Sequence, residues 1–263
     1  MRIIDISEEN KSIYFHCLEH HSDEMAEAVS AKEKWYNEMK EKGLRVKLAE
    51  DDTGDIGGMI QYFPVEESWI EGRDLYFVSC IWVHSNKDGK KNFQGKGMGK
   101  ALMKAAEEDV KTLGKKGIVV WGTSLPVWMK ASWYKKQGYT PVDKKGMFGD
   151  VLLWKTFADD ALPPKWIRSR KKPETSRDKV KVTCMSNGWC SAMNLSCHRV
   201  KEVAGEFGDD VVLEEVSAGD QKAYREWGTS DVIFIDGKKI SMGPPPSKEK
   251  IRKIIEKKVK NKG

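Results

Sequence analysis

The residues best suited to chemistry form a glycine-rich loop, Gln94-Gly95-Lys96-Gly97-Met98-Gly99. It lies between an apolar run and a segment with helical spacing, so we expect it at a helix N-terminus. Converging N–H groups and the helix dipole favour an anion such as pyrophosphate there, and glycines allow close backbone approach. Lys96 and Lys100 add positive charge. A tight structural turn is the simpler interpretation of such a loop taken alone.

Two common nucleotide-binding loops do not fit these residues. A Walker A loop needs four residues between its first glycine and a Gly-Lys-Ser/Thr, and the segment Gly95–Lys100 has neither that spacing nor a following Ser or Thr. A dinucleotide loop belongs to the first strand–helix turn of a parallel unit. This loop comes later, after an apparent antiparallel meander.

The cysteines are a second set of reactive groups. Cys190 is predicted to open a helix, where the dipole lowers a thiol pKa; alternatively, it is only a helix-start residue. Cys184 ends the preceding strand and could reach Cys190 across the loop. Cys197 lies about 10.5 Å along the helix at 1.5 Å per residue, too far for a bridge to Cys190. A metal site of these three cysteines with His198 matches no usual zinc spacing.

The elements around the glycine-rich loop alternate between strands and helices. Apolar runs predict strands at 2–6, 44–51, 56–64, 74–84, 117–122, 139–142 and 151–157. Helical periodicity predicts two helices within 11–42 and one each at 97–114 and 127–138. The sequence therefore predicts an α/β (α+β) fold for residues 1–158, a mixed sheet flanked by helices.

Residues 159–178 combine three prolines with a basic run, which is typical of a linker. The pattern restarts in residues 179–263 with the order β-α-β-α-β-β-α, including a hairpin whose turn is Asp236-Gly237. We therefore expect a second, smaller α/β domain.

The first domain resembles the GNAT acetyltransferase superfamily, whose acetyl-CoA loop reads Gln/Arg-x-x-Gly-x-Gly/Ala between a long strand and a helix. Gln94, Gly97 and Gly99 occupy those positions. The segment Ala131–Tyr139 resembles the A-x-x-Y-x-x-x-G-F/Y segment of the same superfamily. The resemblance covers about residues 1–158.

This resemblance implies a co-substrate and a set of roles. Acetyl-CoA would place its pyrophosphate on the backbone amides of Gln94–Gly99. Its pantetheine arm would pair with the strand end, Ile81, Trp82 and Val83, and a backbone N–H there would polarise the acetyl carbonyl. Tyr134 would donate a proton to the departing thiolate, because a phenol with a pKa near ~10 is protonated at neutral pH. Tyr134 as a packing residue of an amphipathic helix is the alternative.

The general base is left open. His84, Glu66 and Glu67 lie where strand ends could present them to an amine. GNAT sequences commonly place about five residues between the strand-end valine and the Gln/Arg of the loop, whereas Val83 and Gln94 are eleven positions apart. The extra residues 85–92 are polar and should loop out near the co-substrate. Cys80, in mid-strand, is expected to be a small buried hydrophobe.

The second domain resembles thioredoxins, because Trp189-Cys190-Ser191-Ala192-Met193 follows a strand as their W-C-x-x-C site does. Met193 replaces the second cysteine, and Thr229 stands where thioredoxins carry a cis-proline. A conventional dithiol oxidoreductase is therefore not expected. The pairing of the two domains resembles that of the YoaP-type acetyltransferases.

Composition and charge limit which classes of binding partner are expected. The chain has 263 residues and a net charge of +6, and residues 248–263 alone contribute eight Lys or Arg and two Glu. No aromatic residue interleaves with that basic helix, so we expect a solvated face and no nucleic-acid partner. Five cysteines, no spanning apolar run and no evident signal peptide predict a cytoplasmic protein without disulfides or membrane contact.

Three functions follow as hypotheses. The first is transfer of an acetyl group from acetyl-CoA to an amine of a small molecule or peptide. The second is a thiol-reactive or redox-binding protein acting through Cys190, with the first domain as accessory. The third is a CoA-binding sensor without catalysis. The sequence does not name the acceptor or the oligomeric state.

Overall fold

The computed structural model describes residues 1–18, 23–85, 92–124, 129–145, 149–168, 171–219, 221–240 and 244–262. These residues form two compact units. The first comprises Met1–His20 and Glu38–Ile167, and the second comprises His21–Asn37 and Arg168–Gly263. Residues 21–37 fall before the predicted boundary at 158, yet their contacts group them with the second unit. Within the described ranges, no helix is long and apolar enough to cross a membrane.

A mixed sheet forms the centre of the first unit. Its strands, in spatial order, are β1 (Arg2–Asp5), β2 (Arg45–Glu50), β3 (Ile56–Pro64), β5 (Leu75–Val83), β6 (Gly117–Thr123), β8 (Asp150–Thr156) and β7 (Thr140–Lys144). β5 and β6 run parallel, and the other neighbouring pairs are antiparallel. The predicted meander before the loop is thus confirmed. A short sheet pairs β4 (Ile70–Glu71) with β9 (Lys165–Trp166), which falls within the predicted linker.

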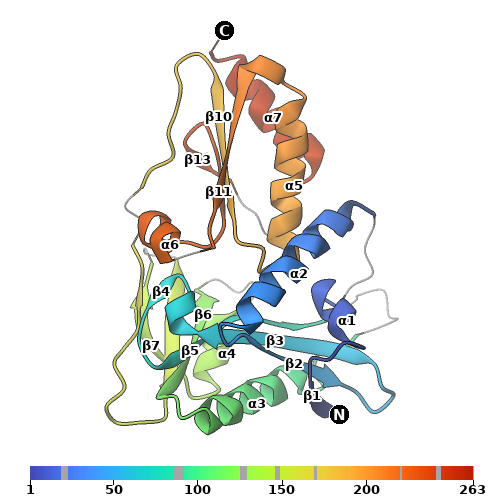
Figure 1. Ribbon diagram of the computed structural model, residues 1–263, viewed down its shortest axis with the longest axis vertical. Coiled ribbons are helices and arrows are strands. Elements are labelled where there is room, and N and C mark those ends of the chain that lie inside the picture. The colour runs from blue at the N-terminus through green and yellow to red at the C-terminus, as the bar shows by residue number, and fades with distance from the viewer. Residues whose placement is uncertain are drawn as a thin grey trace. The chain divides into compact units, whose positions relative to one another are not determined.

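Helix α3 (Met98–Thr112) covers one face of this sheet (Figure 1). Met98, Leu102, Ala106 and Val110 are buried, and their spacing of four places them on one stripe of the helix. This apolar stripe packs with core residues of β3, β5 and β6. The packing fixes the start of α3, and therefore the glycine-rich loop, beside the end of β5. Helix α1 (Lys11–Phe15) also belongs to the first unit and buries Tyr14 and Phe15.

Helix α4 (Ala131–Lys135) is shorter than the helix predicted over 127–138, of which residues 127 and 128 lie outside the described residues. Met129 has a φ of 52° and Lys130 is extended, so the chain is not helical there. The backbone of Thr123 instead donates a hydrogen bond to the Met129 carbonyl at 2.8 Å, which holds this segment along the end of β6. Gly138, with a φ of 88°, follows the last turn, as predicted for a helix stopped by glycine.

Strand β5 carries a β-bulge at Ser79. Its partner β3 pairs Gln61 with Cys80 and Tyr62 with Val78, which leaves Ser79 with no residue opposite it. An extra residue in one strand bends that strand and shifts the alternation of its side chains. The alternation of side chains along β5 is therefore shifted by one residue at Ser79, compared with a strand that has no bulge.

The second unit contains a smaller sheet, ordered β11-β10-β12-β13. β10 (Val180–Ser186) is parallel to β11 (Val211–Ser217) and antiparallel to β12 (Val232–Ile235), which forms a hairpin with β13 (Lys238–Lys239). Helices α5 (Ser191–Gly205) and α7 (Lys248–Val259) pack together with β10, and α6 (Gln221–Trp227) precedes β12 (Figure 1). This order confirms the predicted β-α-β-α-β-β-α pattern.

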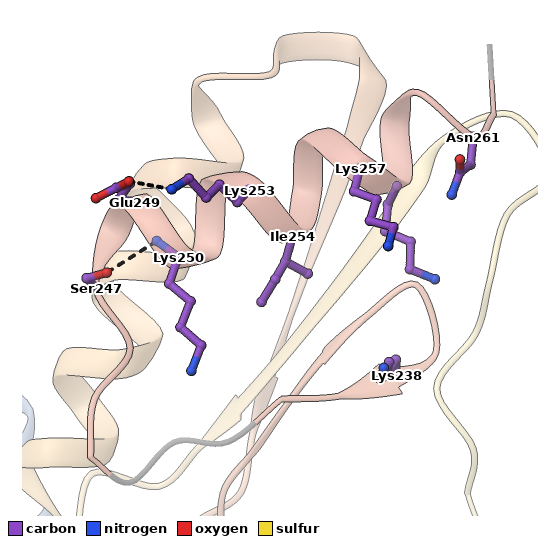
Figure 2. Close-up of a pocket in the computed structure, with 9 residues that line it drawn as sticks. Lys238, Ser247, Glu249, Lys250, Lys253, Ile254, Lys257 and Asn261 are labelled. Carbon is purple, nitrogen blue, oxygen red and sulfur yellow. Dashed lines mark hydrogen bonds and ion pairs between the residues drawn. The ribbon is translucent and has the colours of Figure 1, made fainter.

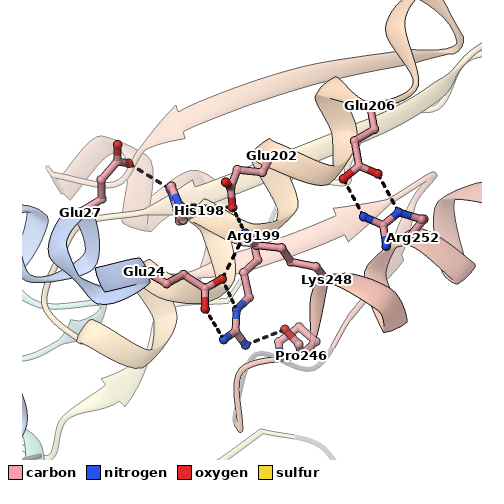
Figure 3. Close-up of polar contacts among 9 residues, drawn as sticks. All are labelled: Glu24, Glu27, His198, Arg199, Glu202, Glu206, Pro246, Lys248 and Arg252. Carbon is pink, nitrogen blue, oxygen red and sulfur yellow. Dashed lines mark hydrogen bonds and ion pairs between the residues drawn. The ribbon is translucent and has the colours of Figure 1, made fainter. Parts of the chain in front are cut away.

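The turn Asp23–Met25 and the first part of α2 (Ala26–Lys40) are held against α5 within the second unit (Figure 3). Arg199 donates two hydrogen bonds to Glu24, at 2.8 and 3.0 Å, and hydrogen bonds from Arg199 lower the pKa of Glu24 to about 2. Asn194 Nδ2 donates to the carbonyl of Ala28 at 3.0 Å, and Met25, Ala28 and Leu195 form an apolar cluster. Residues 23–37 are therefore a structural part of this unit.

Candidate active site

The glycine-rich loop opens α3 with two residues in the left-handed region. Gly95 has a φ of 76° and Gly97, the N-cap of α3, a φ of 81°. A side chain at either position would meet open space, so the glycines are required by backbone conformation and not by crowding. No side chain caps this helix end and no acidic residue lies in its first turn. The first N–H groups of α3 are thus disposed to bind an anion.

A buried phenylalanine anchors the loop to the sheet. The ring of Phe93 is 4% exposed and sits over Gly57 of β3, where an added Cβ would lie 2.3 Å from it. Lys96 Nζ lies 5.0 Å from the centre of the same ring and 3.8 Å from Asp51 Oδ2. Lys100 is exposed. Two cations therefore lie at the helix N-terminus that the glycines leave open.

The additional residues between β5 and the loop close on themselves. Ser85 and Asn92 form an antiparallel bridge, and the Phe93 N–H donates to the carbonyl of His84 at 3.1 Å. Residues 86–91 lie outside the described residues. Because the two ends of the excursion are hydrogen-bonded neighbours, Gln94 follows β5 in space as closely as it would without the extra residues.

β5 and β6 separate beyond the bulge. Their parallel ladder covers Leu75–Val78 and ends with the pair Val78–Val120, although β5 continues to Val83 and β6 to Thr123. We call residues 79–83 of β5 and 121–123 of β6 the strand fork. The three residues expected to contact pantetheine, Ile81, Trp82 and Val83, all lie in the fork and pair with β3 on their other edge.

Tyr134 is buried with its hydroxyl unsatisfied. The residue is 0% exposed, and its Oη has no hydrogen-bond partner within the described part of the chain. Its ring packs edge-on against Trp133 and Tyr139. Burial raises the pKa of Tyr134, and the nearby Cys80 of β5 raises it further. An unsatisfied buried hydroxyl is costly, so this position is one where a bound group could supply the missing acceptor.

The three candidate bases are not brought together. His84 directly follows β5, whereas Glu66 and Glu67 lie in the turn after β3. Because β3 and β5 are antiparallel, that turn lies beside the start of β5 and His84 beside its end. Glu66 accepts a hydrogen bond from the Asp74 N–H at 3.0 Å, and Glu67 lies 3.2 Å from Lys42 Nζ. Of the three, His84 shares the end of β5 with the glycine-rich loop.

The sequence suggested that Cys184 could reach Cys190, whereas in the structure Cys184 contacts Cys197. Cys190 is the half-buried N-cap of α5, as predicted, and its carbonyl accepts from the Asn194 N–H at 2.9 Å. Cys184 and Cys197 are both buried, and their thiols are hydrogen-bonded to each other. That contact and burial raise the pKa of Cys197. Among the described residues, no cluster of ligands for a metal ion is found.

Asp231 is a titratable group that the motifs did not indicate. Its Oδ2 accepts hydrogen bonds from the Trp189 indole and from Ser230 Oγ, the latter at 2.7 Å. Its Oδ1 is out of contact with solvent. Burial raises the pKa of Asp231 to about 6, against the effect of the hydrogen bonds from Ser230 and Trp189. The only sequence signal was an acidic residue placed directly before an apolar strand.

A basic groove lies on the second unit between α7 and the β12–β13 hairpin (Figure 2). Five lysines line it, and two are neutralised, Lys253 by Glu249 and Lys258 by Asp236. The lining contains no aromatic side chain on which a nucleic-acid base could stack. The groove therefore adds no support for a nucleic-acid partner.

Comparison with known families matches residues 42–141 to the acetyltransferase (GNAT) domain. Among solved structures, the chain is similar to the GNAT family N-acetyltransferase YhbS of Escherichia coli in complex with CoA, at 16% identity over 60% of this chain and 82% of that one, with a TM-score of 0.41. It is similar to a Brucella melitensis GNAT acetyltransferase in complex with acetyl-CoA, at 15% identity over 62% and 90% of the two chains, with a TM-score of 0.39. Comparison with curated proteins found no match.

The family match spans β3, the strand fork, the glycine-rich loop, α3 and Tyr134. The elements described above for the candidate active site of the first unit thus fall inside one matched segment. The chain contains a GNAT acetyltransferase domain, and it is an N-acyltransferase.

Proposed function

We propose that the first unit transfers an acetyl group from acetyl-CoA to an amine of a small molecule or peptide. The observation that carries this proposal is the hydroxyl of Tyr134, buried without a partner near Cys80 of the strand fork. A departing thiolate placed in the fork would give that hydroxyl the acceptor it lacks.

The residues of the loop and fork fit the rest of acetyl-CoA. The uncapped N-terminus of α3, with Lys96 and Lys100, would hold the pyrophosphate. The residues Ile81–Val83 are paired with β3 on one edge, and their other edge lies beyond the ladder with β6. A pantetheine amide could hydrogen-bond there as a neighbouring strand would, and a backbone N–H of the fork would polarise the thioester carbonyl.

In the proposed reaction the neutral amine nitrogen attacks the thioester carbonyl carbon. The C–N bond forms, the C–S bond breaks, and the electron pair of that bond leaves on sulfur. Tyr134 donates its hydroxyl hydrogen to the sulfur and takes a proton back from solvent after the products leave. Its raised pKa keeps the phenol protonated in the neutral range before each turnover. The proton released by the amine passes to His84 or to water, and His84 is proposed because it follows the fork directly.

Replacement of Tyr134 by Phe tests this mechanism. If the hydroxyl acts only as sulfur departs, Tyr134→Phe should lower kcat by about a hundredfold and leave KM for acetyl-CoA nearly unchanged. Thiol release should be followed with a panel of amines. Tyr139→Phe is the matched control, because it removes a buried hydroxyl of the same aromatic cluster that is bonded to Glu107. An unchanged kcat in Tyr134→Phe, with chemistry rate-limiting, would reduce Tyr134 to a packing residue.

A second candidate function belongs to the second unit. Its strand order β11-β10-β12-β13, with β10 and β11 parallel, and the position of Cys190 at the start of α5 support a thioredoxin-like module. We propose thiol reactivity at Cys190 without a C-x-x-C bridge, since Met193 occupies the second position. In that case the first unit would act as a CoA sensor. Redox turnover in the absence of CoA would favour this alternative.

A further inference from the structure

A chain of buried polar side chains holds the bulge at Ser79. Tyr14 Oη donates to Gln61 Oε1 at 2.7 Å, and Gln61 Nε2 donates to Ser79 Oγ at 2.8 Å. Tyr14 and Ser79 are 0% exposed and Gln61 is 1% exposed. Gln61 interrupts the otherwise apolar run of β3, and the bulge explains why a polar residue is kept there. Each member of this chain would otherwise be a buried polar group without water.

The same residue is also held from the opposite strand. Trp121 Nε1 of β6 donates to the carbonyl of Ser79 at 2.9 Å. Residues 79 and 121 come directly after the last parallel pair, Val78–Val120. At that point an indole N–H takes the place of a backbone donor. Because the indole nitrogen lies at the far end of its side chain, this bond joins strands that are further apart than the ~4.8 Å of a regular ladder.

Ser79 is therefore fixed by its hydroxyl toward β3 and by its carbonyl toward β6. The bond from Gln61 is buried and the bond from Trp121 is partly buried, and leaving a buried polar partner unsatisfied is costly. The two together determine where β5 bends and how far β6 stands from it. None of these side chains belongs to the glycine-rich loop, and none carries the proposed acid or base.

We propose that Gln61 and Trp121 are positioning residues that set the separation of β5 and β6, and through it the affinity for the pantetheine arm of the co-substrate. This proposal rests on the proposed function of the strand fork. It predicts that the arm and the nucleotide part of CoA respond differently to a change at Ser79. The nucleotide part depends on the glycine-rich loop, whereas the arm depends on the fork.

The test compares two ligands by calorimetry on the full chain. CoA contains the arm, and adenosine 3′-phosphate 5′-diphosphate is the same nucleotide without it. In Trp121→Phe, which keeps an aromatic ring and removes the N–H donor, Kd for CoA should rise about tenfold while Kd for the nucleotide stays within twofold. Gln61→Met, which keeps the length and removes both polar atoms, should show the same split. Hydrogen exchange at residues 79–83 should accelerate in both variants.

Matched controls are Trp154→Phe and Gln137→Met, whose side chains make no hydrogen bond to other described residues. They should leave both Kd values and the exchange of 79–83 unchanged. Trp121→Phe keeps the test decisive if Gln61→Met fails to fold. Equal weakening of both ligands, or no weakening of CoA, would overturn the positioning role. If the wild-type chain binds CoA no more tightly than the nucleotide, the proposed function of the fork fails instead, before any variant is considered.

Discussion

Two helices of this chain each follow a buried strand, α3 after β5 and α5 after β10, and the N-termini of the two helices differ in what they can bind. The start of α3 has glycines with positive φ, an exposed loop and two lysines. The start of α5 has an extended, half-buried cysteine at its N-cap, next to a tryptophan bonded to a buried carboxyl group. Both lack an acidic residue in the first turn.

The difference shows what a helix dipole can and cannot specify. The same partial positive charge favours a bound phosphate when the backbone is bare, and a thiolate when a cysteine occupies the N-cap. The choice is made by the residues just before the helix: glycines leave room for a ligand, whereas Trp189 and Cys190 fill that room with side chains.

The largest expected effect is on the free energy of unfolding and concerns Asp231. This buried carboxyl group is bonded to Trp189, beside the N-terminus of α5, and the N-terminus of α3 has no counterpart to it among the described residues. The pKa of Asp231 in the folded chain, about 6, is above the ordinary 3.8, so the folded state binds the proton more tightly than the unfolded state does. Its contribution to the free energy of unfolding is therefore present below about pH 4 and lost as pH rises through 6, by up to ~3 kcal/mol. Asp231→Asn should remove this part of the pH dependence.

The pH dependence of the free energy of unfolding can be measured by urea unfolding between pH 4 and 7.5. Hydrogen exchange of β10 and β12 reports on the second unit in the same experiment. The exposed Asp209→Asn is the control. If the stability of Asp231→Asn fell between pH 4 and 7.5 by as much as that of the wild type, the assignment to Asp231 would be refuted.

The second largest expected effect comes from comparing valine substitutions of the glycines at the two ends of α3. Gly97→Val should weaken acetyl-CoA binding by more than tenfold, because a branched residue cannot hold a φ of 81° without strain and its side chain would project where the pyrophosphate is proposed to bind. Gly114→Val is the matched control: Gly114 follows the other end of α3, has a φ of 68° and also faces open space.

Both variants should lose similar stability, and only Gly97→Val should lose affinity. Calorimetry on folded protein decides the point. Equal affinities of the two variants for acetyl-CoA would show that the loop is not part of the binding site.

The smallest effect concerns Cys190 itself. At a helix N-cap its thiol should alkylate with iodoacetamide at pH 7 a few times faster than the half-buried Cys17, which ends no strand and opens no helix. Cys184 and Cys197 should react far more slowly, because they are buried against each other. Labelling resolved by mass between pH 5 and 9 gives the four rates. A Cys190 slower than Cys17 would favour a docking role for the second unit.

The sequence was informative wherever one local pattern was sufficient. The apolar runs gave β3 and β5 to within a residue, and the glycines marked the start of α3 and the turn after α4. The order of elements in both units follows from the same periodicities.

Features that depend on contacts distant in sequence could not be predicted. The bulge at Ser79 needs the register of β3, and the shortening of α4 needs the backbone of Thr123. Cys184 meets Cys197 because a strand residue and a helix residue happen to face each other in the core. The buried state of Asp231 likewise needs Trp189, which lies 42 positions away.

The position of residues 23–37 in the chain affects how the protein can fold while it is being synthesised on the ribosome. Their partners on α5 come much later in the chain: Ala28 and Asn194 are separated by 166 positions. At ~5–20 residues per second, this separation corresponds to roughly 10 to 30 s of synthesis. During that interval Met25 and Ala28 have no α5 surface on which to pack. The second unit therefore cannot complete its folding by the simple N-to-C-terminal order that a chain of two consecutive domains would follow.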